Sequence, residues 1–265
     1  MTLSVCVFDE VTKEAGVGLV SCVGGFDLRK TCFVVPGIGA GAVQASALLD
    51  LRLFDQAQKM MGELLTPATM IEVLRTVNYQ RFLSITKGHE VCQFGFVKRM
   101  RSGEVLKKTF TGSRCFGEKN DLSGVDGNVH YAMQGNLLRP AVFEAARAIF
   151  LSTSDFPFPE RILTFLGVGL EAGGDKRSVQ TEGALSGIIQ VARPNDPVGK
   201  PYVDIVDVDS QETLKNLTWR FIRQKVRQER RVNGGRVTDS LRQQLEHFRY
   251  LEDHPGYRGY ASRVA

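Results

Sequence analysis

The order of hydrophobic and polar residues predicts short strands at the start of the chain. Apolar residues dominate 2–8 and 16–22, and the polar run DEVTKEA between them is typical of a hairpin turn. Residues 31–45, TCFVVPGIGAGAVQA, are also rich in strand-forming residues, although Pro36 and several glycines interrupt them. We therefore expect a sheet that begins at Thr2, with the amino terminus held inside the fold.

Apolar residues at helical spacing follow this first group of strands. The spacing predicts helices over 47–65 and 66–77, and in the second of these Thr66 is placed to cap the helix with Pro67 in its first turn. Beyond them we expect strands over 89–99, 103–112, 128–135, 183–192 and 201–209, and helices over 140–152 and 158–173. Strands and helices thus come in groups, which favours an α+β sandwich of antiparallel sheets covered by helix pairs.

The residues after Asp209 have a different character and form a basic helical extension. Twelve Lys/Arg and six Asp/Glu lie in 211–265, which gives this part a net charge of +6. The whole chain has +5, so the rest of the chain carries about −1 and is nearly neutral. We expect a long helix, a break at Gly234–Gly235 and a shorter helix. The boundaries predict a domain over 1–209 and an extension over 210–265.

Two interpretations of the extension are open. A solvated appendage or oligomerisation arm is favoured, with a docking stripe formed by Leu214, Leu217, Phe221 and Ile222. An RNA-binding tail is disfavoured, and it predicts strongly salt-dependent retention on nucleic acid. We therefore expect a homo-oligomer assembled through these helices and no nucleic-acid partner.

The sequence lacks the features of a membrane-spanning protein, of a disulfide-rich protein and of a zinc protein. No apolar run approaches the ~20 residues that span a bilayer, and the start of the chain does not resemble a signal peptide, so a cytoplasmic protein is expected. Five scattered cysteines without a CxxC pair argue against a disulfide framework. Four histidines without zinc-binding spacing predict no metal site.

Three glycines after the strand-like TCFVV invite comparison with a dinucleotide-binding loop. Gly37, Gly39 and Gly41 give GxGxG, in which the third glycine of the GxGxxG fingerprint is displaced. Glycines in a strand often mark a bulge or a close approach of two backbones. We favour this second interpretation and expect no nucleotide cofactor.

Two other stretches allow both a structural and a functional interpretation. A strand runs into Gln134-Gly135-Asn136, which is either a plain turn before the helix near Pro140 or a set of N–H donors for an oxyanion. Residues 173–177, GGDKR, are either a helix C-cap with a solvated loop or a cationic grip on a substrate carboxylate. On residue types alone the turn is favoured at 134–136, and both interpretations of 173–177 stay open.

Taken together, these stretches resemble a known family. The motifs TLSVCVFD, GVGLVS, GIGAGAVQA, TG at Thr111-Gly112, MQGNLLRPAVFEA and LEAGGDKRSVQ occur in the order found in domain-of-unknown-function family 1028, over residues 2–209. That family resembles the N-terminal nucleophile hydrolase superfamily. The resemblance implies a four-layer αββα sandwich of antiparallel sheets, which agrees with the predicted order of elements.

The resemblance also implies a chemical role for Thr2. Aminopeptidases remove an initiator Met readily when a small residue follows it, which would leave Thr2 with a free α-amine. That amine titrates near ~8 and can accept the proton of the threonine hydroxyl. We therefore expect an amidohydrolase without cofactor that cleaves an amide or related C–N bond through an ester on Thr2.

Other site residues follow from the same resemblance. It implies that Gln134, Gly135 and Asn136 lie near the nucleophile, that Asp175, Lys176 and Arg177 line the pocket for a small-molecule amide, and that Gln44 and Ser21 also contribute.

The chain departs from the family pattern in three places. Cys22 replaces a basic residue, Val206 and Ser210 replace the Arg and His of an RVDDH-like run, and 178–183 differ from the usual GRQSAA. The alternative is therefore a catalytically inactive relative that binds a small molecule or serves in assembly.

Overall fold

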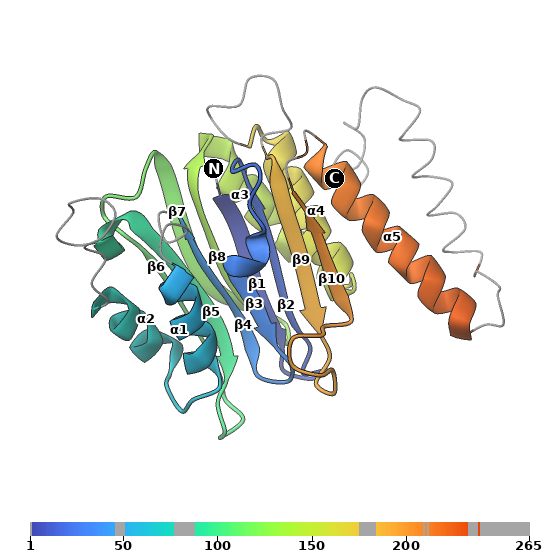
Figure 1. Ribbon diagram of the computed structural model, residues 1–265, viewed down its shortest axis with the longest axis horizontal. Helices are drawn as coiled ribbons and strands as arrows, with labels where there is room; N and C mark the ends of the chain where they lie inside the picture. Colours follow the sequence, from blue (N-terminus) through green and yellow to red (C-terminus); the bar gives the residue numbers. More distant parts are fainter. Residues whose placement is uncertain are drawn as a thin grey trace. The chain divides into compact units, whose positions relative to one another are not determined.

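The computed structural model describes residues 2–45, 51–76, 88–174, 184–208, 210, 212–232 and 238. Two compact units make up the chain, Met1–Leu214 and Lys215–Ala265. The first unit contains two antiparallel sheets and four α-helices within these described residues, which confirms the expected α+β class (Figure 1). None of the helices in the described part of the chain has the length and apolar character needed to cross a membrane.

The larger sheet has six strands, and its centre is the amino-terminal strand. The strands follow the spatial order β10-β9-β2-β1-β8-β7. Their bounds are Val203–Asp207 for β10, Ser186–Ala192 for β9, Ala15–Ser21 for β2, Thr2–Asp9 for β1, Val129–Leu138 for β8 and Glu118–Asp126 for β7. The predicted hairpin of β1 and β2 is confirmed, and β8 pairs with the other edge of β1.

The smaller sheet has four strands in the order β3-β4-β5-β6. Their bounds are Cys32–Val35 for β3, Gly39–Ala45 for β4, Cys92–Arg99 for β5 and Val105–Thr111 for β6. The strands predicted over 89–99 and 103–112 are confirmed as β5 and β6, which pair as an antiparallel hairpin.

The two sheets pack face to face, and a helix pair covers the outer face of each. Strand β1 contacts β4 and β5, while β6 contacts β7 and β8. Helices α3 (Pro140–Ser152) and α4 (Phe158–Glu171) lie on the six-stranded sheet, and α1 (Leu51–Met61) and α2 (Pro67–Thr76) lie on the four-stranded sheet (Figure 1). The layers therefore run helix, sheet, sheet, helix.

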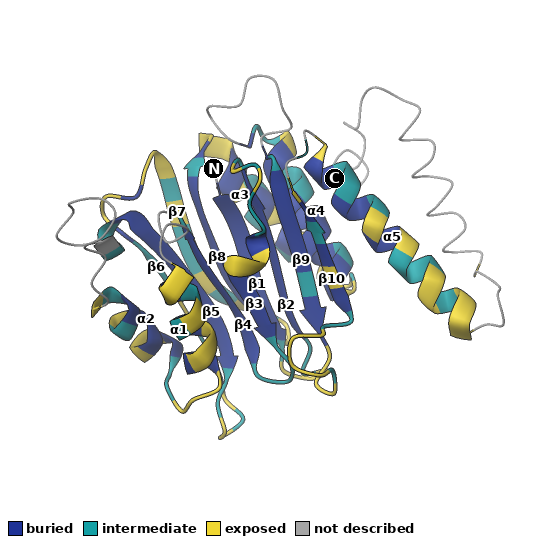
Figure 2. Ribbon diagram, in the orientation of Figure 1, coloured by how far each residue is buried: buried dark blue, intermediate teal, exposed yellow. Residues whose placement is uncertain are grey.

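Side-chain alternation along the strands creates separate apolar layers. On β1, Cys6 and Phe8 point between the sheets, where they join a buried cluster with Val17, Ala42 and Val97. A second cluster lies under α1 and α2 and is built largely from Leu, Met and Phe side chains. Figure 2 shows the result, with strands buried along most of their length and the outer faces of the helices exposed.

Glycines on β2 allow α4 to pack closely against the six-stranded sheet. A Cβ at Gly18 would lie 2.2 Å from Ile162 Cγ2, and one at Gly16 would lie 2.9 Å from Ile162 Cδ1. Any side chain at these positions would push the helix outward.

The buried side chain of Lys98, in β5 of the smaller sheet, binds carbonyl oxygens where α1 ends. Its Nζ donates to the carbonyl oxygens of Met60 at 3.1 Å, Glu63 at 2.6 Å and Leu65 at 2.8 Å. Met60 lies in the last turn of α1, and Glu63 and Leu65 follow it, so a single ammonium group of β5 holds the end of the helix and the connection to α2. The following helix begins as predicted, because Thr66 Oγ1 accepts from Thr69 N at 3.1 Å.

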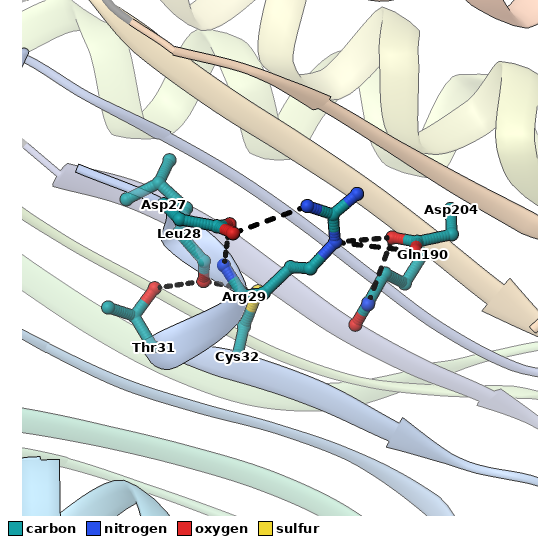
Figure 3. A network of polar contacts seen from close by, with 7 residues as sticks. All are labelled: Asp27, Leu28, Arg29, Thr31, Cys32, Gln190 and Asp204. Carbon is teal, nitrogen blue, oxygen red and sulfur yellow. Dashed lines mark hydrogen bonds and ion pairs between the residues drawn. The ribbon is translucent and has the colours of Figure 1, made fainter. Parts of the chain in front are cut away.

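A polar network joins the β2–β3 connection to the edge of the six-stranded sheet (Figure 3). Arg29, in the short helix η1 (Leu28–Lys30), contacts Asp204 of β10 at 3.3 Å and Asp27 at 3.2 Å. Gln190 of β9 donates to the same Asp204 at 3.2 Å. The network ties the crossing between the sheets to β9 and β10.

The GxGxG segment forms a hairpin turn and not a dinucleotide-binding loop. Gly37 has a left-handed φ of 68°, and Ile38 N donates to Val35 O at 3.0 Å to close the turn between antiparallel β3 and β4. A Cβ at Gly39 would lie 2.1 Å from Val97 O. The glycines therefore permit the turn and the close approach of β4 to β5.

Some predicted boundaries differ from the structure. Strand β7 was not expected, because EKNDLSGVD is a polar edge strand with little apolar alternation. Helix α1 is shorter than the predicted 47–65, whose first residues lie outside the described part of the chain. Helix α5 spans Thr213–Val232, as expected for the start of the extension, while the break at Gly234–Gly235 and the shorter helix lie outside the described residues.

Candidate functional site

Thr2 is the first residue of the central strand pair and is firmly placed in the sheet. It lies opposite Ser21 of β2 on one side and opposite Asn136 of β8 on the other. Its exposed fraction is 4%. The amino-terminal end of the fold is therefore a buried strand position, as the sequence predicted.

Both polar groups of Thr2 have partners from these neighbouring strands. The backbone nitrogen donates to Asn136 Oδ1 at 3.0 Å, and the hydroxyl Oγ1 lies 3.3 Å from Ser21 Oγ. Asn136 Nδ2 in turn contacts Cys115 Sγ at 3.5 Å. Burial raises the pKa of the Cys115 thiol, so this sulfur is a neutral and weak acceptor.

The face of β1 that carries Thr2 points between the two sheets. Residues two apart on a strand share a face, so Thr2 and Ser4 lie on the same face as Cys6 and Phe8 of the apolar inter-sheet cluster. The inter-sheet layer is thus apolar along most of its length and polar at the end where Thr2 lies.

Gln93 of β5 is a central member of this polar end, and the sequence analysis did not identify it. Its Nε2 donates to Thr111 Oγ1 and to Gly135 O, both at 2.9 Å, and its Oε1 accepts from Gln44 Nε2 at 2.9 Å. It therefore joins the two sheets. A signal was available, since Gln93 is the one polar residue in the otherwise apolar run VCQFGFV.

Gln134 reaches from the six-stranded sheet onto the four-stranded one. Its Nε2 donates to Ala42 O at 3.2 Å. Gly95 makes room for this carboxamide, because a Cβ at Gly95 would lie 2.4 Å from Gln134 Oε1. Gln134 thus lies over β4 and β5, the same two strands that are joined by the hydrogen bond of Gln44 to Gln93.

Three buried polar atoms in this region have no hydrogen-bond partner among the described residues. They are Ser4 Oγ, Gln44 Oε1 and Gln134 Oε1, and all three residues are 0% exposed. An unsatisfied buried polar group costs about 1–3 kcal/mol. Apolar side chains would avoid this cost, which makes this polar cluster a candidate for a functional site.

Two strained backbone positions directly follow candidate residues. Among the described non-glycine residues, only Lys13, Ala45 and Leu137 have a left-handed φ, with values of 61°, 64° and 54°. Ala45 follows Gln44 and Leu137 follows Asn136. Such residues cluster at functional sites because the surrounding structure must hold them in place.

The strain at Leu137 belongs to a β-bulge. The register of β7 with β8 shifts between Glu118 and Lys119, so that Leu137 has no partner residue on β7. Bulges redirect neighbouring side chains and are frequent beside active sites. This bulge directly follows the residue that binds the Thr2 nitrogen.

The turn expected at Gln134-Gly135-Asn136 is wrong. All three residues lie inside β8 and pair with β1 and β7, so no turn presents their backbone N–H groups to an oxyanion. The left-handed φ of this segment is at Leu137, after these three residues. This segment contributes the side chains of Gln134 and Asn136 to the site.

The cationic segment Asp175, Lys176 and Arg177 lies outside the described residues. The chain before it behaves as predicted for a C-cap, because Gly173 and Gly174 have φ values of 114° and 47° after the end of α4. After the segment, Leu185 N donates to Ser21 O at 2.8 Å. The described chain therefore resumes beside a residue that contacts Thr2.

Three residues that depart from the family pattern have ordinary places in the fold, while the departing segment 178–183 lies outside the described residues. Cys22 is half-buried and follows Ser21. Val206 lies in β10 and packs against the inter-sheet cluster. Ser210 Oγ accepts from Glu212 N at 3.1 Å, just before α5 begins. Among the described residues, no three His, Cys, Asp or Glu side chains form a group that could hold a metal ion.

Comparison with known proteins links the chain to one family. The model of a family of unknown function, DUF1028, matches residues 2–217. The crystal structure of protein SPO2555 from Silicibacter pomeroyi, which carries the same family name, aligns with a TM-score of 0.64 and 17% identity over 84% of this chain and 88% of that one. At this identity the likeness shows a shared fold. A search of curated proteins found no match.

Proposed function

The chain belongs to the DUF1028 family, and we propose that it is an amidohydrolase whose nucleophile is Thr2 after removal of Met1. The observation that carries the proposal is the contact of Thr2 N with Asn136 Oδ1 at 3.0 Å in the middle of a sheet. Once Met1 is gone, that nitrogen is a primary amine, and Asn136 can orient it beside the hydroxyl of the same residue.

The reaction follows from these groups. The Thr2 hydroxyl oxygen attacks the amide carbonyl carbon, while the α-amine accepts the hydroxyl proton directly or through water. The C–N bond breaks, and the leaving amine takes that proton. Water then hydrolyses the ester on Thr2 and restores the free amino alcohol.

The surrounding fold supports the same proposal. Two facing sheets with a helix pair on each outer face are the layers expected for an N-terminal nucleophile hydrolase. Ser21 contacts the Thr2 hydroxyl, and the strained Leu137 follows Asn136. From the family resemblance we also propose that Lys176 and Arg177 bind the substrate.

A screen of small amides, with free-amine release as the readout, tests the proposal. Processed wild-type protein should turn over at least one amide class. Thr2→Ala should abolish this turnover while the protein stays folded, and Thr2→Ser should retain part of it because a hydroxyl remains. Turnover by Thr2→Ala equal to that of the wild type would contradict the proposal.

A second candidate is a non-catalytic relative that binds a small molecule or serves in assembly. The observation that favours it is the 4% exposed fraction of Thr2, together with the loss of the family's Arg and His at Val206 and Ser210. Saturable binding of an amide by protein that lacks Met1, without any turnover or acylation of Thr2, would establish this alternative.

A further inference from the structure

The Gln93 side chain has hydrogen-bond partners on four different strands. It lies in β5, opposite Gln44 of β4 and Thr111 of β6 in the register of the smaller sheet. Its third partner, Gly135 O, belongs to β8 of the larger sheet. Asn120 O of β7 lies 3.4 Å from the same Nε2 atom.

The Gly135 carbonyl decides how the Gln93 carboxamide is oriented. A backbone carbonyl can only accept a hydrogen bond, so the group that faces it must be Nε2 and not Oε1. Gln93 Oε1 then faces Gln44, which must present its own Nε2. The carbonyl of Gly135 thus determines the orientation of the carboxamides of both Gln93 and Gln44. Gln44 Oε1 remains available as an acceptor.

Gln134 is oriented independently by the same rule. Its Nε2 must face Ala42 O, which is again an obligate acceptor, and its Oε1 is left without a partner among the described residues.

Gly135, whose carbonyl accepts from Gln93, is the residue just before Asn136, which binds the nitrogen of Thr2. Gly135 directly precedes Asn136, whose Oδ1 accepts from Thr2 N, and the strained bulge residue Leu137 follows. A strand interrupted by a bulge has lost part of its ladder and can shift locally. The hydrogen bond from Gln93 restrains β8 on the side of Asn136 away from the bulge.

We propose that Gln93 is a positioning residue for the reaction of Thr2. By donating to Gly135 O it fixes the place of Asn136, and so the direction of the Thr2 amine, without touching the substrate itself. The inference rests on the proposed function, in which Thr2 is the nucleophile.

Acylation by a fluorescent β-lactone tests the inference, with intact mass as the readout. The Thr2 hydroxyl oxygen forms an ester with the lactone carbonyl carbon, the ring C–O bond breaks, and the proton ends on the former ring oxygen. Full-length processed wild type, Gln93→Met, Gln93→Glu and the blank Thr2→Ala are compared. The maximal acylation rate and the half-saturating lactone concentration are measured separately, from about pH 5 to about pH 9.

Thr109→Val is the matched control. Thr109 Oγ1 donates to Asp121 Oδ1 at 2.6 Å, so this variant also removes a hydrogen bond between β6 and the larger sheet but leaves Gly135 untouched. It should acylate within about twofold of the wild type.

Gln93→Met should lower the maximal rate at least about tenfold and change the half-saturating concentration little. Gln93→Glu tests the role through the pH dependence of the acylation rate, which a purely structural role of Gln93 would leave unchanged. Its protonated carboxyl can still donate to Gly135 O, whereas the ionised form repels that oxygen. Its rate relative to wild type should therefore fall about tenfold as pH rises.

The outcomes separate the two claims. If wild type is acylated at Thr2 and both Gln93 variants react like it at every pH, the positioning role is overturned and the nucleophile stands. If wild type reacts no more than Thr2→Ala, the nucleophile is overturned and the positioning role with it. Should Gln93→Met fail to fold, the pH-dependent ratio of Gln93→Glu decides alone.

Discussion

Asn136 accepts a hydrogen bond from the backbone nitrogen of Thr2 at 3.0 Å, across a register pair between two central strands. Asn136 is neutral, so it can orient an amine at this position without adding a charge beside it. Its other amide atom faces the neutral sulfur of Cys115. Acid–base behaviour at Thr2 should therefore be sensitive to charge placed at position 136.

Asn136→Asp should shift the pH dependence of the Thr2 reaction upward. A carboxylate beside the terminal amine favours its protonated form and raises the amine pKa by about 1 unit or more. The neutral amine, which is the base, then forms only at higher pH. The rate of β-lactone acylation against pH measures this. Asn136→Ala, which adds no charge, should lower the rate without the shift, and coincident pH profiles for Asn136→Asp and wild type would contradict the account.

The five thiols should differ sharply in reactivity in the folded protein. Cys22 is half-buried, while the other four are buried, and burial raises the pKa of Cys6, Cys32 and Cys115. Since the thiolate is the reactive form, iodoacetamide at neutral pH should label Cys22 first. Mass spectrometry of digested protein identifies the labelled residue. Labelling of Cys115 as fast as Cys22 would show that the region around Asn136 is open to solvent.

Ala45→Gly should stabilise the protein. Ala45 has φ 64°, a conformation that costs a non-glycine residue about 1–2 kcal/mol and costs glycine nothing. The greater freedom of glycine in the unfolded chain offsets part of this gain, which leaves about 0.5 kcal/mol. Urea unfolding measures the difference. Ala42→Gly, in the extended part of the same strand, is the control and should destabilise. A loss of stability in Ala45→Gly would mean that the left-handed backbone is not strained.

Lys98→Met should destabilise the protein by about 2 kcal/mol, because one carbonyl oxygen in the last turn of α1 and two in the connection to α2 lose a charged donor. Lys59→Met, on the exposed side of the same helix, is the matched control and should change little. The free energy of unfolding in urea gives the comparison. Equal effects of the two substitutions would rule out a special role for Lys98.

The sequence was informative about elements and less so about the residues that meet between them. Periodicity located most strands and helices, including α3 at Pro140–Ser152, because these segments bury one regular face. Strand β7 escaped prediction because it is polar and lies at a sheet edge. The placement of β8 beside β1 depends on long-range pairing, which periodicity does not encode.

The candidate site shows the same limit. Thr2, Ser21, Gln44, Gln134 and Asn136 were named from family resemblance, and the structure places them at one polar end of the inter-sheet layer. Gln93 was missed, since a single polar residue in an apolar run gains meaning only when its partners are known. The strain at Ala45 and Leu137 was also invisible, because neither residue type signals a left-handed backbone.

The most direct measurement compares two forms of the protein that differ only at the amino terminus. One begins with a free Thr2, and the other retains Met1 behind a short tag; both are treated with the β-lactone and analysed by intact mass and peptide mapping. The account predicts one acyl group, on Thr2, in the first form and none in the second. Equal acylation of both forms, or an adduct on another residue, would contradict it.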